Sequence, residues 1–243
     1  MAQPDPVHLS VVIPAYNEEP RIEATLTSIC AYLRNQPYPS EVIVVDDGSR
    51  DRTAGRAAEA LRGVERQAIL RLPRNKGKGA AVREGVRKAA GEFILVSDAD
   101  LSTPITEIDK FWPWMDQGYD VVIGSRAIAG ADIQIRQSLL RELMGKTFNL
   151  FVRGLIMTGI PDTQCGFKLF RREAAKRVFA VAAIDGFSFD VEALYLCRRV
   201  HRIRQVPVIW RNSPHSKVRL VRGSCQMLSD LYKIRRLHGK KKK

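Results

Sequence analysis

The sequence predicts an α/β fold in which helices flank a single, mainly parallel β-sheet. Short β-branched runs alternate with helical apolar patterns through the first half of the chain. The chain has 243 residues, of which 45% are hydrophobic, and this is enough for one packed domain. Polar or acidic residues follow several of the expected strands directly, at the edge where parallel sheets bind ligands.

Five strands are expected in the first half of the chain, with a helix after each of the first four. The expected strands are Leu9–Ile13, Val42–Val45, Ala68–Leu72, Phe93–Val96 and Tyr119–Ile123. The expected helices are one with apolar positions at Ile22, Leu26, Ile29 and Leu33, then Asp51–Leu61, Gly77–Ala90, and one that begins at Pro104. Gly91 is expected to cap the third of these helices.

The second half of the chain is less regular and more basic from about Ala131 to Ile160. Ile203–Trp210 predicts a late strand, and Ser224–Leu237 predicts a terminal amphipathic helix with Met227, Leu231 and Ile234 on one face. Lys240–Lys243 is expected to be a solvated tail. Residues 8–220 are therefore expected to form one domain, and residues 221–243 a C-terminal helix with a basic tail.

The charge balance indicates an anionic partner. The net charge is +14, from 40 basic and 26 acidic side chains. Such a balance is consistent with nucleic acid, a membrane surface or phosphorylated ligands, and it does not choose among them.

Cysteine usage and hydropathy exclude several other classes. The four cysteines are widely spaced without a CxxC pair, so a zinc site is not expected. No secretory signal pattern opens the chain, so an intracellular location with reduced thiols is expected. The longest apolar candidate, Phe148–Ile160, is interrupted by Arg153 and shorter than the roughly 18 to 20 residues that a membrane-spanning helix needs.

Asp98-Ala99-Asp100 follows the fourth expected strand. Two carboxylates two residues apart at a strand end can hold a hard cation such as Mg²⁺ or Mn²⁺. Such a cation can bind a diphosphate and stabilise it as it leaves. The alternative is a turn in which the aspartates bond to local backbone groups. Because other strand ends are also acidic, the motif favours a metal site at Asp98 and Asp100.

Two other strand ends carry candidate nucleotide contacts. In Pro14–Glu18, Tyr16 can stack on a base and Glu18 can bind a base or ribose. In Asp46–Asp51, Asp47 can accept hydrogen bonds from the nucleotide, whereas Asp51 is expected to cap the next helix. An ordinary strand-to-helix turn explains the first segment equally well, whereas in the second segment a turn with an N-cap and a nucleotide contact are compatible.

Two basic segments are candidate anion sites. Asn75–Gly79 opens a helix, where exposed amides and Lys78 favour phosphate, although it lacks P-loop spacing and helix entry alone would also account for it. Arg126 follows the fifth strand and offers a planar fork that suits phosphate. Scattered arginines such as Arg136 and Arg141 are also consistent with a solvated basic face. His201, Met227 and the tryptophans are expected to have packing roles only.

These motifs, in this order and each at a strand end, resemble glycosyltransferase family 2. They are Val11–Glu18, Asp46–Ser49 with Asp51, Asp98–Asp100 and Gly124–Arg126. The resemblance spans about Ser10 to Lys217 and implies a Rossmann-like GT-A fold with a nucleotide-sugar donor. Within the family, the chain most resembles the polyprenyl-phosphate branch and its dolichyl-phosphate β-glucosyltransferases. The segments that carry this closer resemblance are Asp162–Phe170, Phe187–Glu192 and Trp210 through Ser216–Val218.

The resemblance also implies roles for individual residues. The nucleotide-sugar would be bound by Pro14, Tyr16, Glu18, Asp47, Lys78, Asp98 and Ala99. Asp98 and Asp100 would hold Mg²⁺ or Mn²⁺, and Arg126 with Arg141 would bind the acceptor phosphate. Lys217 would approach the donor diphosphate from a closing loop, so that Asp100, Arg126 and Lys217 are the expected catalytic residues. Ser102 departs from mannosyl members, which often carry Gln at this position.

The implied reaction is the inverting, metal-dependent transfer of a hexose, glucose in preference to mannose, from UDP to polyprenyl or dolichyl phosphate. A phosphate monoester is largely ionised at pH 7, so it needs no strong general base. Asp190 could be mistaken for such a base, and it is equally consistent with an N-cap. The basic surface is expected to bind anionic lipid on the cytoplasmic face of a membrane. Leu139–Ile160 could lie in that interface or pack as a helix pair on the core.

Four alternatives remain open at this point. Two of them are a GDP-mannose-dependent polyprenyl-phosphate mannosyltransferase and a family 2 enzyme that acts on a polysaccharide hydroxyl. The third is a nucleotidyltransferase, which also uses paired carboxylates. The fourth is a nucleic-acid-binding module, which is disfavoured because acidic strand ends repel phosphate unless a metal intervenes.

Overall fold

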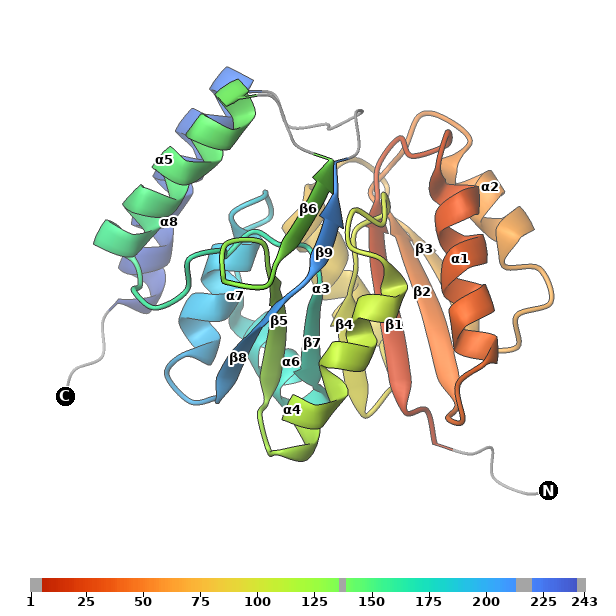
Figure 1. Ribbon diagram of the computed structural model, residues 1–243. Coiled ribbons are helices and arrows are strands. Elements are labelled where there is room, and N and C mark those ends of the chain that lie inside the picture. Colours follow the sequence, from red (N-terminus) through yellow and green to blue (C-terminus); the bar gives the residue numbers. More distant parts are fainter. Residues whose placement is uncertain (1–5, 136–138, 213–219, 240–243) are drawn as a thin grey trace.

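The computed structural model describes residues 6–135, 139–212 and 220–239, and it confirms the predicted α/β architecture (Figure 1). Within these residues, a mixed sheet of seven strands lies between helices on both faces. Its strands are β1 (Leu9–Ala15), β2 (Ser40–Asp46), β3 (Gln67–Arg71), β4 (Phe93–Val96), β5 (Val121–Ser125), β7 (Lys168–Arg171) and β8 (Ile203–Pro207).

The order of the strands is β3-β2-β1-β4-β7-β5-β8. Every neighbouring pair is parallel except for the two pairs that contain β7, which runs antiparallel to both β4 and β5. Lys168, the first residue of β7, therefore lies beside Val96, the last residue of β4. As a result, the segment that enters β7 reaches the same edge of the sheet as the segments that leave the parallel strands.

One face of the sheet is covered by a helical layer, in which α1 and α4 lie at the front of Figure 1. Its members are α1 (Ile22–Arg34), α2 (Thr53–Ala60), the 3-10 helix η1 (Ile105–Lys110) and α4 (Trp112–Asp116). The opposite face is covered by α3 (Lys78–Lys88), α6 (Arg172–Val181) and α7 (Phe189–Cys197). Because both faces are covered, every residue of β1 is buried, and this explains why most of its residues are apolar.

The helices α5 (Leu139–Leu155) and α8 (Leu220–His238) lie side by side at one end of the molecule (Figure 1). Phe148 and Val152 of α5 are buried in the same core cluster as Leu231 and Ile234 of α8. The terminal amphipathic helix predicted from the sequence is thereby confirmed. Of the two predictions for Leu139–Ile160, the packing of α5 agrees with a helix pair on the core, and the outer side of α5 is exposed. Among the described residues, no helix combines the length and the apolar character that a bilayer span requires.

The late strand predicted at Ile203–Trp210 is two strands. The chain leaves the main sheet after β8 and continues as β9 (Ile209–Arg211), which pairs with β6 (Asp132–Ile135) in a separate ribbon. Val208 connects the two sheets. Its N–H donates to the Ser125 carbonyl of the main sheet, and its carbonyl accepts the Asp132 N–H of the ribbon.

The role predicted for Gly91 as a helix cap is wrong. Helix α3 ends at Lys88, and Gly91 instead packs on the start of β1. A Cβ atom at position 91 would lie 2.5 Å from the backbone nitrogen of Ser10, so close approach of two backbones explains this glycine.

Candidate active site

A cavity of about 530 Å³ opens at the carboxyl edge of the parallel strands. This is where ligands bind in open α/β sheets, beside the point at which the strand order reverses between β1 and β4. The structure brings nine sequence-predicted site residues together in its lining: Pro14, Tyr16, Glu18, Asp47, Lys78, Asp98, Ala99, Asp100 and Arg126. Lys217 lies outside the described residues, as does the side chain of Arg141 on α5.

Asp98 is held between a lysine and a glycine at the end of β4. Lys78 at the start of α3 places Nζ 2.5 Å from Asp98 Oδ1. A Cβ atom at Gly166 would lie 2.0 Å from Asp98 Oδ2, so the carboxylate fills the space that a side chain there would need. Burial acts to lower the pKa of Lys78, but the charges of Asp98, Asp190 and Asp100 raise it overall. The raised pKa favours the charged form of Lys78 beside the acidic pair.

Asp100 and Arg21 complete this part of the cavity. The Ser102 N–H donates to Asp100 Oδ1 at 2.9 Å, in a turn where Leu101 adopts a φ of 45°. Arg21 precedes α1 and was not identified from the sequence. Burial acts to lower its pKa, whereas Glu18, Asp100 and Asp98 raise it overall. The guanidinium of Arg21 donates to the Glu18 carboxylate and lines the cavity, so it adds a positive charge at the entrance to the first helix.

The donor atoms of Asp98 and Asp100 fit a hard divalent cation. Both residues line the cavity and supply carboxylate oxygens, the ligands that Mg²⁺ and Mn²⁺ prefer. Within the described ranges, no group of three or more His, Cys, Asp or Glu side chains is arranged to hold a metal. A cation here would therefore take most of its ligands from a bound diphosphate and water, as Mg²⁺ commonly does.

Asp47 organises the opposite end of the cavity. Its two carboxylate oxygens accept the backbone N–H groups of Lys76 at 2.7 Å and Gly77 at 2.8 Å. Burial raises the pKa of Asp47, and these two hydrogen bonds counteract part of the rise. Gly77 has a φ of 114°, and a Cβ atom there would lie 2.4 Å from the Asp185 carbonyl oxygen. The end of β2 is thereby tied to the start of α3.

Arg126 at the end of β5 is fixed by Asp162. Its backbone N–H donates to Asp162 at 2.9 Å, and its Nε and Nη2 each donate at 2.8 Å. The Trp210 ring centroid lies 5.3 Å from the Arg126 Cζ atom. Burial acts to raise the pKa of Asp162, but the Arg126 charge and hydrogen bonds lower it overall. The outer edge of the guanidinium, with Nη1, is not engaged by Asp162 and can face a ligand.

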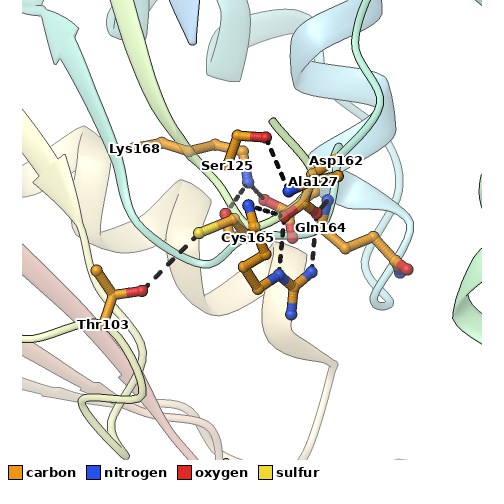
Figure 2. A network of polar contacts seen from close by, with 9 residues as sticks. Thr103, Ser125, Ala127, Asp162, Gln164, Cys165 and Lys168 are labelled. Atoms are coloured by element: carbon orange, nitrogen blue, oxygen red, sulfur yellow. Dashed lines mark hydrogen bonds and ion pairs between the residues drawn. The ribbon is translucent and has the colours of Figure 1, made fainter. Parts of the chain in front are cut away.

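A second buried ion pair lies at the start of β7. Lys168 Nζ is 2.5 Å from Asp190 Oδ1 and also donates to the Cys165 carbonyl. Figure 2 shows Asp162 and Lys168 in one polar network between the end of β5 and the start of β7. Asp190 is not the N-cap that the sequence suggested, because α7 begins one residue earlier and its N-cap is Ser188.

Sequence reasoning assigned no role to Asp162 or Lys168. The available signal was a lysine within the otherwise apolar run Gly166–Phe170, since a buried charge needs a partner. Trp210 and Met227 were expected to pack, and both are buried. Trp210 packs beside the Arg126 guanidinium, and Met227 also lines the cavity.

One wall of the cavity is apolar. It is formed by Met144 and Phe148 of α5, Phe187 of the loop before α7, and Met227 of α8. The cavity therefore joins a charged half at the sheet edge with a hydrophobic half under the α5–α8 pair.

Comparison with known proteins agrees with this geometry. Residues 10–179 match the family described as Glycosyl transferase family 2. The dolichyl-phosphate beta-glucosyltransferase of Homo sapiens is 37% identical over 242 residues, which cover 93% of this chain and 74% of the relative. The protein of the same name from Dictyostelium discoideum is 35% identical over 95% of this chain and 75% of its own.

Solved structures show the same fold at low sequence identity. Mannosyl-3-phosphoglycerate synthase from Rubrobacter xylanophilus superimposes with a TM-score of 0.71 at 21% identity, over 98% of this chain and 76% of that one. Glucosyl-3-phosphoglycerate synthase from Mycobacterium tuberculosis, in complex with Mn²⁺, UDP-glucose and phosphoglyceric acid, gives a TM-score of 0.66 at 21% identity, over 94% and 79%. The fold is the GT-A fold that the resemblance implied. The chain is therefore a glycosyltransferase, and it belongs to glycosyl transferase family 2.

Proposed function

We propose that this enzyme transfers glucose from UDP-glucose to a polyprenyl or dolichyl phosphate, with inversion at the anomeric carbon. The observation that carries the proposal is that a charged half and an apolar half meet in one cavity. A nucleotide diphosphate-sugar suits the first half, and a lipid phosphate suits the junction of the two. The names of the relatives, dolichyl-phosphate beta-glucosyltransferases, support the same donor sugar and acceptor.

The donor would extend along the sheet edge from β2 to β4. Tyr16 and Asp47 would contact the nucleotide, with Pro14 and Glu18 beside them. The diphosphate would lie near Asp98, Ala99 and Asp100, where Lys78 and Arg21 supply positive charge. A bound Mg²⁺ or Mn²⁺ at Asp98 and Asp100 would neutralise charge on the departing diphosphate.

The acceptor would enter from the apolar wall. Arg126 would bind the lipid phosphate through the edge of its guanidinium that Asp162 leaves exposed, together with Arg141. The first isoprene units would contact Met144, Phe148 and Met227, whose side chains offer the hydrophobic surface that such a chain requires. Lys217 would approach the diphosphate from its own segment.

The reaction needs alignment more than proton transfer. An oxygen of the acceptor phosphate forms the new bond to the anomeric carbon, while the bond from that carbon to the UDP oxygen breaks and its electron pair leaves with UDP. The acceptor is largely ionised at pH 7, so no side chain has to remove a proton. Arg126 and Lys78 would hold the two phosphate groups at fixed positions, and such positioning can account for much of the rate enhancement.

A transfer assay tests the proposal. The protein is incubated with UDP-[¹⁴C]glucose, Mg²⁺ and dolichyl phosphate, and the lipid is then extracted. We expect label in the organic phase with dolichyl phosphate and none with unphosphorylated dolichol, because the phosphate is the nucleophile. Transfer from GDP-mannose alone, transfer to a polysaccharide acceptor alone, or release of pyrophosphate in place of UDP would each contradict it.

We also propose that the α5–α8 pair binds an anionic membrane surface on its cytoplasmic face. Its outer side exposes Leu143, Leu150 and Phe151 on α5 and Tyr232 on α8, with 62%, 69%, 44% and 70% of each residue accessible. Basic side chains Arg153, Lys233, Arg235 and Arg236 are exposed on the same two helices. Basic residues near an anionic bilayer contribute about 1 kcal/mol each.

Flotation with liposomes tests this surface. We expect binding to phosphatidylserine-containing vesicles that weakens as salt rises, because screening shortens the range of the attraction. Leu150→Asp should reduce binding, since it places a charge on the apolar face. Val200→Asp, at an exposed apolar residue in the turn after α7, is the matched control and should float like the wild type. Equal flotation of both variants would exclude the α5 face as the binding surface.

A further inference from the structure

One charged residue on the cavity wall has no part in the proposed mechanism. Asp190 lines the cavity, yet its side chain is only 5% accessible. Its partner Lys168 is 2% accessible and reaches it from the start of β7. Burying two charges costs several kcal/mol per ion before their attraction is counted. A purely structural role would be met as well by an apolar pair, so the location of this pair at a ligand cavity calls for an explanation.

The neighbouring acidic residue on α7 makes a useful comparison. Glu192 is also buried, but its carboxylate accepts the backbone N–H groups of Ala183 and Ile184 and bonds to His238 Nε2. It does not contribute to the cavity lining. Glu192 therefore has a structural role that its contacts explain, whereas Asp190 combines one buried lysine with a position on the cavity wall.

The charged neighbours of Asp190 differ from those of Asp47. Burial raises the pKa of Asp190, the ammonium groups of Lys168 and Lys78 counteract the rise, and Asp98 adds to it. Asp47 at the nucleotide end interacts instead with Asp46 and Asp185. Lys78 Nζ lies 2.5 Å from Asp98 Oδ1 and 5.6 Å from the ring centroid of Phe189, the residue before Asp190, so Asp190 lies at the Asp98 end of the cavity. A donor that extends from Asp47 past Asp98 would bring its hexose next to Asp190.

We infer that Asp190 accepts a hydrogen bond from a hydroxyl group of the donor hexose, and that Lys168 positions the carboxylate for this contact. The inference rests on the proposed function and adds a sugar subsite to it. Lys168 Nζ donates to Oδ1 of Asp190 and to the Cys165 carbonyl. These two bonds fix the lysine, and the lysine in turn holds the Asp190 carboxylate in one orientation. A buried carboxylate that bonds to a hydroxyl discriminates strongly against a sugar that lacks it, because the charge is then left unpaired.

This role differs from that of a general base. A base would act on the acceptor and would leave donor affinity unchanged when mutated. A sugar contact acts on donor affinity in the absence of any acceptor, so binding measurements distinguish the two.

Calorimetry with UDP and UDP-glucose, both with Mg²⁺, tests the inference. For the wild type, we expect UDP-glucose to bind more tightly than UDP. Asp190→Asn should leave UDP affinity within about twofold and weaken UDP-glucose by roughly 10- to 100-fold, the range for a hydrogen bond to a charged group. UDP-sugars deoxygenated singly at C2, C3, C4 or C6 identify the hydroxyl. One of these deoxy donors should bind the wild type as weakly as UDP-glucose binds Asp190→Asn. The same deoxy donor should lose no further affinity when it is tested with Asp190→Asn.

The double variant Asp190→Asn with Lys168→Gln separates sugar binding from ion pairing. Asp190→Asn alone leaves Lys168 buried without its counter-charge, and the double variant removes that lysine charge as well. Thermal unfolding measures whether the double variant remains folded. We expect weak UDP-glucose binding to persist in the double variant. Recovery of wild-type affinity would overturn the inference, since Asp190 would then serve only to neutralise Lys168. Equal wild-type affinities for UDP and UDP-glucose would also overturn the inference. If the wild type binds UDP-glucose but does not transfer glucose to dolichyl phosphate, the result counts against the proposed acceptor alone.

Discussion

Replacing Asp100 by alanine is expected to lower glucose transfer by about 10³-fold, the upper range for the loss of one group that stabilises developing charge. Asp100 lines the cavity beside Asp98, and its recorded hydrogen bond is to the nearby Ser102 N–H. The substitution therefore removes a ligand for Mg²⁺ or Mn²⁺ without disturbing a long-range contact. The main loss should appear in kcat, because the charge on the leaving diphosphate increases in the transition state.

The measurement is the rate of label transfer to dolichyl phosphate over a range of Mg²⁺ and Mn²⁺ concentrations. EDTA should abolish transfer by the wild type, and added metal should restore it. Asp116→Ala, at an exposed aspartate that ends α4, is the matched control and should retain full activity. Equal rates for Asp100→Ala and the wild type would exclude a metal role for this carboxylate.

Asp162→Asn is expected to lower the free energy of unfolding by about 3 kcal/mol at pH 7, the scale for breaking a buried ion pair. Asp162 is 2% accessible and accepts three hydrogen bonds from Arg126, so an amide nitrogen at this position would face a donor. Transfer activity should fall as well, because Arg126 would lose the contacts that orient its guanidinium toward the acceptor.

The pH dependence of this loss follows from the direction of the pKa shift. Arg126 lowers the pKa of Asp162 in the folded state, so its contribution is complete above the unfolded value of about 3.9. It disappears only as the pH falls through the lower folded value. The difference in unfolding free energy between wild type and variant should therefore be the same at pH 8, 6 and 5, and should shrink below about pH 4.

Urea unfolding across this pH series measures the difference. Asp185→Asn is the matched control, since Asp185 also pairs with an arginine, Arg83, but its side chain is 54% accessible. Its loss should not exceed about 1 kcal/mol, as for other exposed ion pairs. A wild-type advantage that fell between pH 8 and pH 6 would point to a histidine and contradict the assignment to Asp162.

The sequence alone was sufficient to predict the parallel half of the fold and the gathering of its acidic residues. Four of the first five strands end in a polar or charged segment, and parallel strands share one carboxyl edge, so Asp47, Asp98 and Arg126 were expected to lie at that edge. The charge of these residues and their place after a strand carried the prediction. The alternative of separate local turns does not account for their convergence on one cavity.

Local sequence patterns could not predict the rest of the site. Strand β7 has four residues, too few for periodicity to identify, and nothing near it in sequence indicates that it runs antiparallel. The pairs Arg126–Asp162 and Lys168–Asp190 join residues far apart along the chain. The pairing of α5 with α8, which contributes the apolar wall, is likewise a tertiary contact that neither helix specifies by itself.

The insertion of β7 between two strands that precede it in the sequence leads us to expect a particular order of folding. The pairs β1–β2 and β2–β3 join strands close in sequence, so the edge that carries Tyr16 and Asp47 can assemble from short loops, whereas the β1–β4 pair joins strands far apart in sequence. Insertion of β7 between β4 and β5 requires a much longer loop to close first. Gly166, Asp162 and Lys168 arrive together at that late step. A newly made chain would thus gain a nucleotide pocket before it gains the machinery that positions the sugar and the lipid phosphate.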